Sequence, residues 1–387
     1  MRILFTVSTY KPHTDGIQFV TSYLAEGLAE KGHQVDLIAY EYPNLTALKE
    51  EDINGVHVIR WKAKTVHMRH RGDKDGYQRY ILENQMRYDV IVNVGTQTAL
   101  TDWLFPIIGK IRVPMILHLH SIWDFAFCKT DFTSIKSAVS KLFGTARWGH
   151  YYFWNKKVFQ QYDAVMQLHE NDQAYAFFKK HYKIDSIILE NAAEEAFFEG
   201  DTPEKKPILL YVANYGKMKN QMECIKVFEK CDLPDDWMLK FVGSKETAYY
   251  RELRDYCESR MVSQKRGKVE LLVGLSREQV IQLIKESSIY LTTSLKEAFP
   301  ISILEAMAAG IPFVSKDVGV VKCLPGGLIA HDQEEFVQMI EHLVSNDSYR
   351  EELGELGRRE ACEKYRIAKK VAQLEHILEA VIAKHKA

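Results

Sequence analysis

The chain has 387 residues, of which 46% are hydrophobic and 27% charged, a composition typical of folded globular proteins of two or three domains. The formal net charge is −1, so the overall charge gives no reason to expect a nucleic-acid partner. The six cysteines form no C-x-x-C pair and no zinc-type cluster with histidine, and no long uncharged apolar run occurs. We therefore expect a cytoplasmic protein without a structural zinc site or a membrane-spanning helix.

The first half of the chain alternates short apolar runs with longer amphipathic stretches. The apolar runs predict buried strands at Ile3–Ser8, Val35–Tyr40, Asp89–Val94, Pro114–His120, Asp163–Leu168 and Ile184–Leu189. Helical spacing predicts helices at Gly16–Lys31, at Thr98–Ile111 and in a segment that ends at Phe178. The polar stretch Asn191–Pro207 then interrupts the pattern and indicates an interdomain linker.

The second half repeats the pattern. Strands are predicted at Ile208–Ala213, Met238–Val242, Val269–Leu272, Ile289–Thr293 and Ile311–Ser315. Helices are predicted at Gln221–Lys230, Thr247–Glu258, Arg277–Glu286, Ile301–Ala309, Glu334–Val344 and Tyr365–Lys386. Two such series predict an α/β protein with two doubly wound parallel sheets. Ligands of these sheets bind beyond the carboxyl ends of the strands, so we expect the site in a central cleft that both domains face.

The segment Thr292–Ser315 carries the most chemical information. Glu297 lies in the loop after a predicted strand, and Pro300 suits the first turn of the next helix, where its missing N–H costs little. Free amides around Ala298–Ile301 would lie beside the positive end of that helix, which suits a phosphate or the polar edge of a sugar. Glu297 can accept hydrogen bonds from sugar hydroxyls, and Glu305 from a second diol such as a ribose. Solvated acids at a helix start are the alternative interpretation.

This stretch resembles the signature of a known enzyme family. Glu297 and Glu305 lie within the pattern S-x-x-E-A-F-P-x-x-x-L-E-A-M-A-x-G-x-P, which is similar to the signature of glycosyltransferase family 4. The resemblance extends over nearly the whole chain and implies the GT-B fold, with two Rossmann-like domains, and transfer with retention of anomeric configuration. We accordingly expect an acceptor domain at 1–190, a linker at 191–207, a donor domain at 208–364 and a C-terminal helix at 365–387 that crosses back to the first domain.

The resemblance also implies roles for the residues around the two acids. Glu297 would contact the donor sugar and Glu305 the nucleotide ribose, while amides near Phe299 and Pro300 would hold the diphosphate and the sugar. Pro300 stands where many members have glycine, which removes one amide donor. Val318-Gly319, after the next predicted strand, is similar to the donor-side glycine turn of the family.

A basic segment before the second predicted helix of the donor domain matches another family pattern. Lys219 falls on the lysine that pairs with the donor diphosphate, where a cation stabilises the developing charge of the leaving group. Asn214 stands where the family usually has arginine, and Lys217 is a candidate substitute for that charge. A solvated helix start is the alternative interpretation for both lysines.

Four further residues match donor-side positions of the family. Gly16 falls on an N-terminal glycine loop that approaches the phosphates, although a simple helix-capping turn fits equally well. His120 falls on a histidine near the donor sugar, and a buried core histidine is the alternative. Gly243 and Val273 lie at turns that contact the nucleotide base in the family.

The resemblance assigns catalysis to Glu297, His120 and Lys219. The sequence contains no D-x-D motif, so we expect no catalytic metal and no cofactor, with a nucleotide sugar, UDP-sugar favoured, as donor substrate. In retaining members the departing phosphate is thought to help deprotonate the acceptor hydroxyl. A covalent nucleophile is the alternative mechanism.

Two basic stretches of the first half point to the acceptor. Arg60–Arg79 contains seven Lys or Arg residues, and Lys129–Lys157 contains six with many aromatic residues between them. Basic, aromatic helical segments suit an anionic membrane surface, so we expect a glycan, lipid-linked or protein acceptor and a peripheral location at the inner face of the membrane. The alternative is a solvated basic face whose aromatic side chains pack on the core.

The leading hypothesis is retaining hexosyl transfer in surface polysaccharide, lipid-linked glycan or glycoconjugate biosynthesis. Three other functions fit the same fold. A sugar phosphorylase would use free phosphate and no nucleotide, and an epimerase would interconvert nucleotide sugars without an acceptor. A non-catalytic partner subunit would bind a nucleotide or support an active transferase. The departures at Asn214 and Pro300 favour the last of these, and the presence of both acids argues against it.

Overall fold

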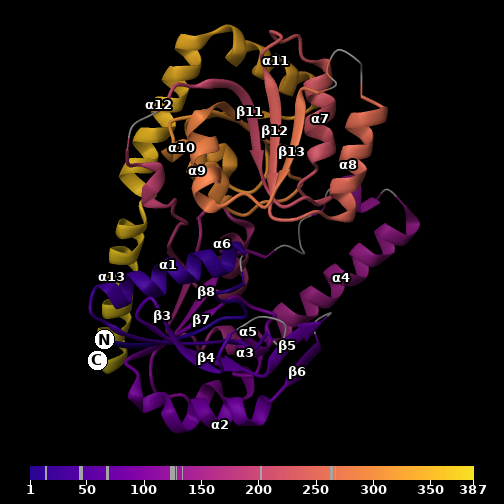
Figure 1. Ribbon diagram of the computed structural model, residues 1–387. Coiled ribbons are helices and arrows are strands. Elements are labelled where there is room, and N and C mark those ends of the chain that lie inside the picture. The colour runs from indigo at the N-terminus through magenta and orange to yellow at the C-terminus, as the bar shows by residue number, and fades with distance from the viewer. Residues whose placement is uncertain are drawn as a thin grey trace. The chain divides into compact units, whose positions relative to one another are not determined.

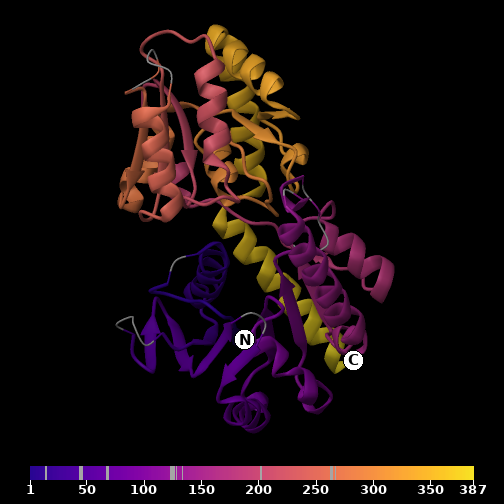
Figure 2. The same cartoon turned by 90° about the vertical axis from the view of Figure 1, so that its right-hand side faces the viewer.

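The structure is a computed structural model that describes residues 1–13, 15–42, 47–66, 69–122, 127, 129–132, 134–200, 203–261, 265 and 267–387. The chain divides into two compact units, which we call unit 1 (Met1–Glu190 with Ile367–Ala387) and unit 2 (Asn191–Arg366). Each unit contains one large sheet with helices on both faces (Figure 1). Both chain ends belong to unit 1 (Figure 2).

The sheet of unit 1 has eight strands in the order β10-β9-β8-β7-β1-β2-β4-β3. All neighbouring strands are parallel except β3 and β4, which are antiparallel. The strands are β1 (Arg2–Thr6), β2 (Gln34–Tyr40), β3 (Glu50–Ile53), β4 (Val56–Trp61), β7 (Val90–Val94), β8 (Met115–Leu119), β9 (Ala164–Gln167) and β10 (Ile187–Ile188), with a separate antiparallel pair formed by β5 (Ala63–Val66) and β6 (Arg69–Gly72). The helices are α1 (Gly16–Glu30), α2 (Lys74–Asn84), α3 (Ala99–Asp102), α4 (Ile135–Trp154), α5 (Lys156–Phe159), α6 (Gln173–Phe177) and α13 (Ile367–Lys386).

The two faces of this sheet are covered by different helices. Alternate strand residues such as Leu4, Ile91 and Leu117 pack in one core with side chains of α2, α3, α4 and α5. Helices α1 and α13 pack against each other elsewhere in unit 1, and α13, yellow in Figure 2, carries Glu375, which pairs with Lys31 and His33 beyond the end of α1. Parallel strands buried on both sides explain why their sequences are almost continuously apolar.

The sheet of unit 2 has six strands, all parallel, in the order β13-β12-β11-β14-β15-β16. The strands are β11 (Lys206–Val212), β12 (Met238–Gly243), β13 (Val269–Val273), β14 (Ser287–Thr292), β15 (Phe313–Lys316) and β16 (Gly327–Ala330). The helices are α7 (Gln221–Lys230), α8 (Ala248–Ser259), α9 (Arg277–Glu286), α10 (Ile301–Ala308), α11 (Gln333–Ser345) and α12 (Asp347–Lys364). Side chains of α7, α8 and α11 share one core with the sheet, and Tyr349 and Leu353 of α12 pack against it, while α9 and α10 form contacts elsewhere along the sheet.

The first and last segments of unit 2 meet at Phe299, in the loop before α10. The Asn191 side-chain amide donates a hydrogen bond to the Phe299 carbonyl over 2.8 Å. The amide of Ala193 donates to the carbonyl of Tyr365 over 2.9 Å, and the Tyr365 ring packs edge-on against Phe299 with centroids 5.7 Å apart. The chain therefore enters and leaves unit 2 beside the same loop residue.

The predicted fold class is confirmed, because both large sheets are doubly wound and parallel apart from one edge strand. The helix predicted at Thr98–Ile111 is wrong: α3 ends at Asp102 and a 3₁₀ helix follows at Phe105–Lys110, since Pro106 has no N–H to continue an α-helix. The basic stretch Arg60–Arg79 is mostly strand rather than helix, because its alternating residues pair as β5 and β6. Strand β11 begins at Lys206, inside the predicted linker.

The packing of α1 on α13 yields a stability prediction. A methyl group at Gly27 would lie 2.5 Å from Cγ2 of Val371, well inside van der Waals contact. Alanine is favoured over glycine in a helix by about 1 kcal/mol, whereas overpacking costs about 1–3 kcal/mol. We expect Gly27→Ala to lower the free energy of unfolding in the natural chain and to raise it by about 1 kcal/mol in a Val371→Ala background. Urea unfolding of the four proteins measures both effects, and the same sign in both backgrounds would contradict the packing described.

Candidate functional site

The predicted donor residues of unit 2 gather at one edge of its sheet. Asn214 and Lys219 follow β11, and Glu297 follows β14, while Gly243 and Val273 are the last residues of β12 and β13. Because all these strands are parallel, their carboxyl ends lie along the same edge, where doubly wound sheets bind ligands.

Lys219 and Glu297 form an ion pair at this edge, with Lys219 Nζ 2.6 Å from Glu297 Oε1. The two loops that carry them are joined by the main chain, since the Leu295 amide donates to the Met218 carbonyl over 2.9 Å. The Tyr211 hydroxyl donates to the Lys219 carbonyl over 2.6 Å. The lysine and the acid are thus held together by the surrounding backbone, 78 residues apart in sequence.

The loop from Glu297 to Pro300 is fixed from both sides. The Val320 amide donates to the Ala298 carbonyl over 3.2 Å, and Asn191 holds the Phe299 carbonyl. The carbonyls of Ala298 and Phe299 are therefore both hydrogen-bonded within the protein. Pro300 is the N-cap of α10, one residue before the predicted helix start at Ile301, and the first-turn amides of a helix have no partner within it.

Gly319 is needed for this arrangement. Its φ is +56°, and a Cβ atom would lie 2.3 Å from the Glu297 carbonyl oxygen and 2.4 Å from that of Ala298. Only glycine allows the backbone to approach the loop this closely. The predicted glycine turn therefore supports the loop that carries Glu297.

Glu305 is buried and paired with an arginine that sequence reasoning missed. Its carboxylate, in α10, contacts the guanidinium of Arg277, the first residue of α9. Arg277 also pairs with Glu194 over 2.8 Å and lies 5.2 Å above the ring of Phe197. Burial raises the pKa of Glu305, and the charge of Arg277 opposes that rise. The only sequence signal for Arg277 was its place at a helix start, where solvated charges are common.

Asn214, Gly243 and Val273 have structural roles at the same edge. Asn214 Oδ1 accepts hydrogen bonds from the Ser244 amide (3.2 Å) and hydroxyl (2.7 Å), so it ties the loops after β11 and β12 together. A Cβ at Gly243 would lie 2.6 Å from the ring of Tyr215, so packing alone explains why this position is glycine. Val273 pairs in register with Gly243. Contact of these three residues with a nucleotide base stays a prediction.

Gly16 and His120 belong to unit 1. Gly16 is the first residue of α1, whose N-cap is Asp15, and a methyl group there would meet nothing within 4 Å. His120 follows β8, with its ring 4.4 Å from that of His118. Burial lowers the pKa of His120 to about 4, although the charge of Asp15 acts in the opposite direction. His120 is therefore neutral at physiological pH and suited to hydrogen bonding rather than to acid catalysis.

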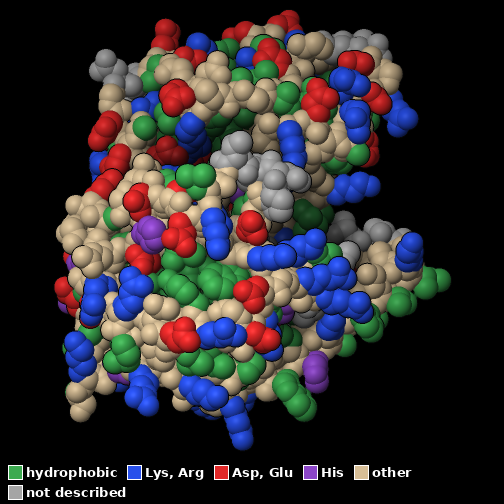
Figure 3. Space-filling view, turned by 60° about the horizontal axis from the view of Figure 1, so that its bottom comes forward, with side chains coloured by type: hydrophobic (Ala, Val, Ile, Leu, Met, Phe, Trp, Pro, Cys, Tyr) green, Lys and Arg blue, Asp and Glu red, His purple; other side chains and the backbone are tan. Residues whose placement is uncertain are grey.

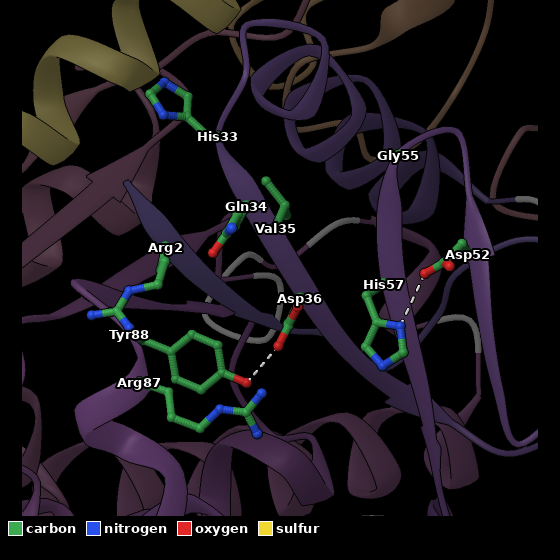
Figure 4. A pocket seen from close by; sticks show the side chains of 10 residues that line it. All are labelled: Arg2, His33, Gln34, Val35, Asp36, Asp52, Gly55, His57, Arg87 and Tyr88. Atoms are coloured by element: carbon green, nitrogen blue, oxygen red, sulfur yellow. Dashed lines mark hydrogen bonds and ion pairs between the residues drawn. The ribbon is translucent and has the colours of Figure 1, made fainter.

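A cavity of about 400 Å³ lies in unit 1 at the amino ends of β1 and β2, whereas His120 follows the carboxyl end of β8 (Figure 4). Two pairs of its polar side chains bond to each other: the Tyr88 hydroxyl donates to Asp36 over 2.7 Å, and His57 pairs with Asp52 over 2.9 Å. None of the predicted site residues lines it. The cavity is therefore separate from the candidate donor site.

In the part of the chain that the structure describes, no cluster of three or more His, Cys, Asp or Glu side chains is arranged to hold a metal ion. In the same residues no helix has both the length and the apolar composition needed to cross a membrane.

Solved structures show the fold. The sucrose-phosphate synthase of Thermosynechococcus elongatus superposes with a TM-score of 0.75 at 16% identity, covering 99% of both chains. The Anabaena protein HepE in complex with UDP superposes with a TM-score of 0.73 at 16% identity, covering 98% of this chain and 100% of HepE. The two units thus have the GT-B fold of glycosyltransferases.

Sequence comparisons give the family. The model "Glycosyl transferase 4-like domain" matches residues 15–180, and the model "Glycosyl transferases group 1" matches residues 192–360. The N-acetyl-α-D-glucosaminyl L-malate synthase of Bacillus anthracis is 22% identical over 404 aligned positions, which cover 97% of each chain. The chain belongs to the GT4-type glycosyltransferases, as its motifs indicated.

The Arg277–Glu305 pair predicts a pH-dependent stability. The Glu305 carboxyl has a raised pKa in the folded state, so its contribution to stability is present below the unfolded pKa and is lost as pH rises through the folded pKa. Arg277→Gln removes the opposing charge and raises that pKa further. We expect the variant to lose about 1–3 kcal/mol of unfolding free energy at neutral pH, less than for a fully buried pair, because the Arg277 side chain is 38% exposed.

This loss should shrink as pH falls, because protonated Glu305 needs no cation. Urea unfolding across the range from about pH 5 to 8 measures the trend. Adding Glu305→Gln to the variant should abolish the pH dependence, and a loss independent of pH would show that Arg277 acts through packing alone.

Proposed function

We propose that this glycosyltransferase retains anomeric configuration, needs no metal and moves a sugar from a nucleotide sugar, UDP-sugar favoured, to an acceptor hydroxyl. The observation that carries the proposal is the ion pair of Lys219 and Glu297 beside the start of α10. A cation, a carboxylate and a helix N-terminus at one sheet edge suit the diphosphate and the hydroxyls of a sugar nucleotide.

The ion pair suggests how donor binding and catalysis are connected. A diphosphate competes with Glu297 for Lys219, and Glu297 is then released to accept hydrogen bonds from sugar hydroxyls. Negative charge on the leaving phosphate increases as the glycosidic bond breaks, so Lys219 binds the transition state more strongly than the ground state. Lys219 and the α10 dipole supply the positive charge that a divalent metal supplies in other transferases.

The nucleotide would occupy the neighbouring part of the edge. Arg277 contacts Oε1 of Glu305, so Oε2 is the oxygen for a ribose diol, and Gly243 and Val273 mark the strand ends beside the base. UDP as the nucleotide is supported by HepE, which was solved with UDP and with UDP-glucose. His120, neutral at physiological pH, would donate or accept one hydrogen bond at the donor sugar.

The acceptor is proposed to belong to surface polysaccharide, lipid-linked glycan or glycoconjugate biosynthesis at the inner face of a membrane. The basic character of the stretch Lys129–Lys157 supports an anionic setting. The departing phosphate would deprotonate the acceptor hydroxyl on the face where that hydroxyl attacks, which gives retention. The Bacillus anthracis relative is named an N-acetyl-α-D-glucosaminyl L-malate synthase, and malate carries a hydroxyl group.

A thermal-shift panel with UDP, GDP, ADP and their sugar conjugates in excess EDTA tests the donor site. Because a ligand that binds only the folded state stabilises it, UDP at a hundredfold excess over Kd should add about 2.7 kcal/mol, and Glu305→Ala should remove most of the shift. Glu270→Ala, which breaks the Lys240–Glu270 pair of the same unit away from the site, is the matched control and should keep the shift. No shift with any nucleotide would favour a phosphorylase or a non-catalytic subunit.

Turnover tests the catalytic assignment. UDP release from the UDP-sugar that gives the largest shift, measured in EDTA, should fall roughly 10²–10³-fold in Glu297→Ala, the loss typical of one transition-state contact. NMR of the first sugar released should show the anomer of the donor. Undiminished turnover in Glu297→Ala would refute the role of Glu297, the inverted anomer would refute retention, and no turnover without added metal would refute metal independence.

A further inference from the structure

Helix α4 exposes large apolar side chains in two groups, one toward each end of the helix. Figure 1 shows this 20-residue helix projecting from the rest of unit 1. Six large hydrophobic side chains of α4 are between 53% and 86% exposed: Ile135, Val139, Leu142, Phe143, Phe153 and Trp154. Their spacing places them on one side of the helix, and we call them the α4 stripe.

The other side of α4 is already used for packing. Tyr152 is buried in the core of unit 1, and its neighbour Tyr151 packs on Phe159 with ring centroids 6.2 Å apart. The helix therefore has two apolar sides. Unit 1 covers one of them, and on the other its rings of Phe177 and His181 contact Phe153, which stays 53% exposed. Scattered exposed hydrophobic residues need no explanation, but six large ones gathered on one side of a single helix indicate a surface that binds something.

The charge around the stripe identifies the partner. Between Ser134 and Tyr162 the chain contains Lys136, Lys141, Arg147, Lys156 and Lys157 but no Asp or Glu, although the net charge of the whole chain is −1. Figure 3 shows hydrophobic side chains along the outer edge of the projecting segment with Lys and Arg side chains beside them. Apolar and basic residues side by side on one helix are typical of helices that lie in the interface of an anionic membrane.

Further basic residues continue this surface at the C-terminal end of α4. The ring of Phe153 packs edge-on against His181 with centroids 5.3 Å apart. His181 lies in the π-helical turn Phe178–Tyr182, where Lys179 and Lys180 are exposed. The stripe is therefore bordered by positive charge along the helix and at its end.

We infer that α4 docks unit 1 on a membrane rich in anionic lipids, with the α4 stripe at the boundary of headgroups and acyl chains. This inference rests on the proposed membrane location of the acceptor and adds the surface that reaches it. A second copy of the chain fits less well as the occupant, because two arms of the same positive charge would repel each other where they meet.

Vesicle co-sedimentation tests the inference with the full-length chain. The natural protein should bind vesicles of phosphatidylcholine and phosphatidylglycerol in equal parts, and bind pure phosphatidylcholine far less. A stripe variant, Phe143→Ser with Trp154→Ser, should lose binding roughly tenfold or more, because burial of these side chains is removed. A charge variant, Lys136→Gln with Arg147→Gln, should lose a similar factor and show a weaker dependence on salt.

Matched controls lie elsewhere in unit 1. Met86, 67% exposed, and Leu48, 68% exposed, are as accessible as the stripe, so changing both to serine should leave vesicle binding unchanged. Lys74→Gln with Arg79→Gln, on the exposed side of α2, is the control for charge. Equal losses in the controls, or full binding by the stripe variant, would overturn the inference. So would light scattering that shows a dimer for the natural chain and a monomer for the stripe variant.

The UDP thermal shift separates this inference from the proposed function. All α4 variants should keep the shift, because α4 belongs to unit 1 and the UDP site is proposed in unit 2. A UDP shift without vesicle binding would overturn the docking surface alone. Vesicle binding without a UDP shift would overturn the donor assignment alone.

Discussion

The ion pair of Lys219 and Glu297 is the constraint around which the candidate site is organised. It neutralises two charges that would otherwise stand close together at the edge of the sheet, and it holds the loops after β11 and β14 in one arrangement. Gly319 and Asn191 fix the second of these loops from either side. The site is thus preorganised by the protein itself, and an anionic ligand has to exchange partners within it rather than assemble it.

Much of the candidate site could be predicted from the sequence, because its elements follow one another directly along the chain. Strand β14, the loop with Glu297 and helix α10 follow one another directly, so apolar periodicity, Pro300 and Gly310 were enough to place them. Arg277 could not be found in this way, since it meets Glu305 only when α9 and α10 pack, 28 residues apart. Gly243 was predicted as a ligand contact, whereas its lack of a side chain is explained by the ring of Tyr215, a steric relation that sequence spacing does not show.

In unit 1, too, local patterns could be predicted and contacts formed by packing could not. The basic stretches were recognised from composition, but composition does not tell a strand pair from an amphipathic helix. The first stretch contains β5, β6 and the start of α2, while most of the second forms α4. Tyr152 shows that some aromatic residues of the second stretch belong to the core, and Trp154 shows that others do not. Which side of a helix is covered depends on tertiary packing, and only the structure reports it.

The contact at Phe299 has a consequence for regulation. Asn191 and Tyr365, beside the two connections of unit 2 to the rest of the chain, both contact Phe299, which lies in the loop from Glu297 to Pro300. Any ligand that changes the conformation of this loop therefore changes the free energy of the contacts at the two connections. By linkage, any strain applied through the connections changes the affinity of the loop for that ligand. Phe299 thus makes the loop from Glu297 to Pro300 responsive to forces that act on the chain at a distance from any ligand.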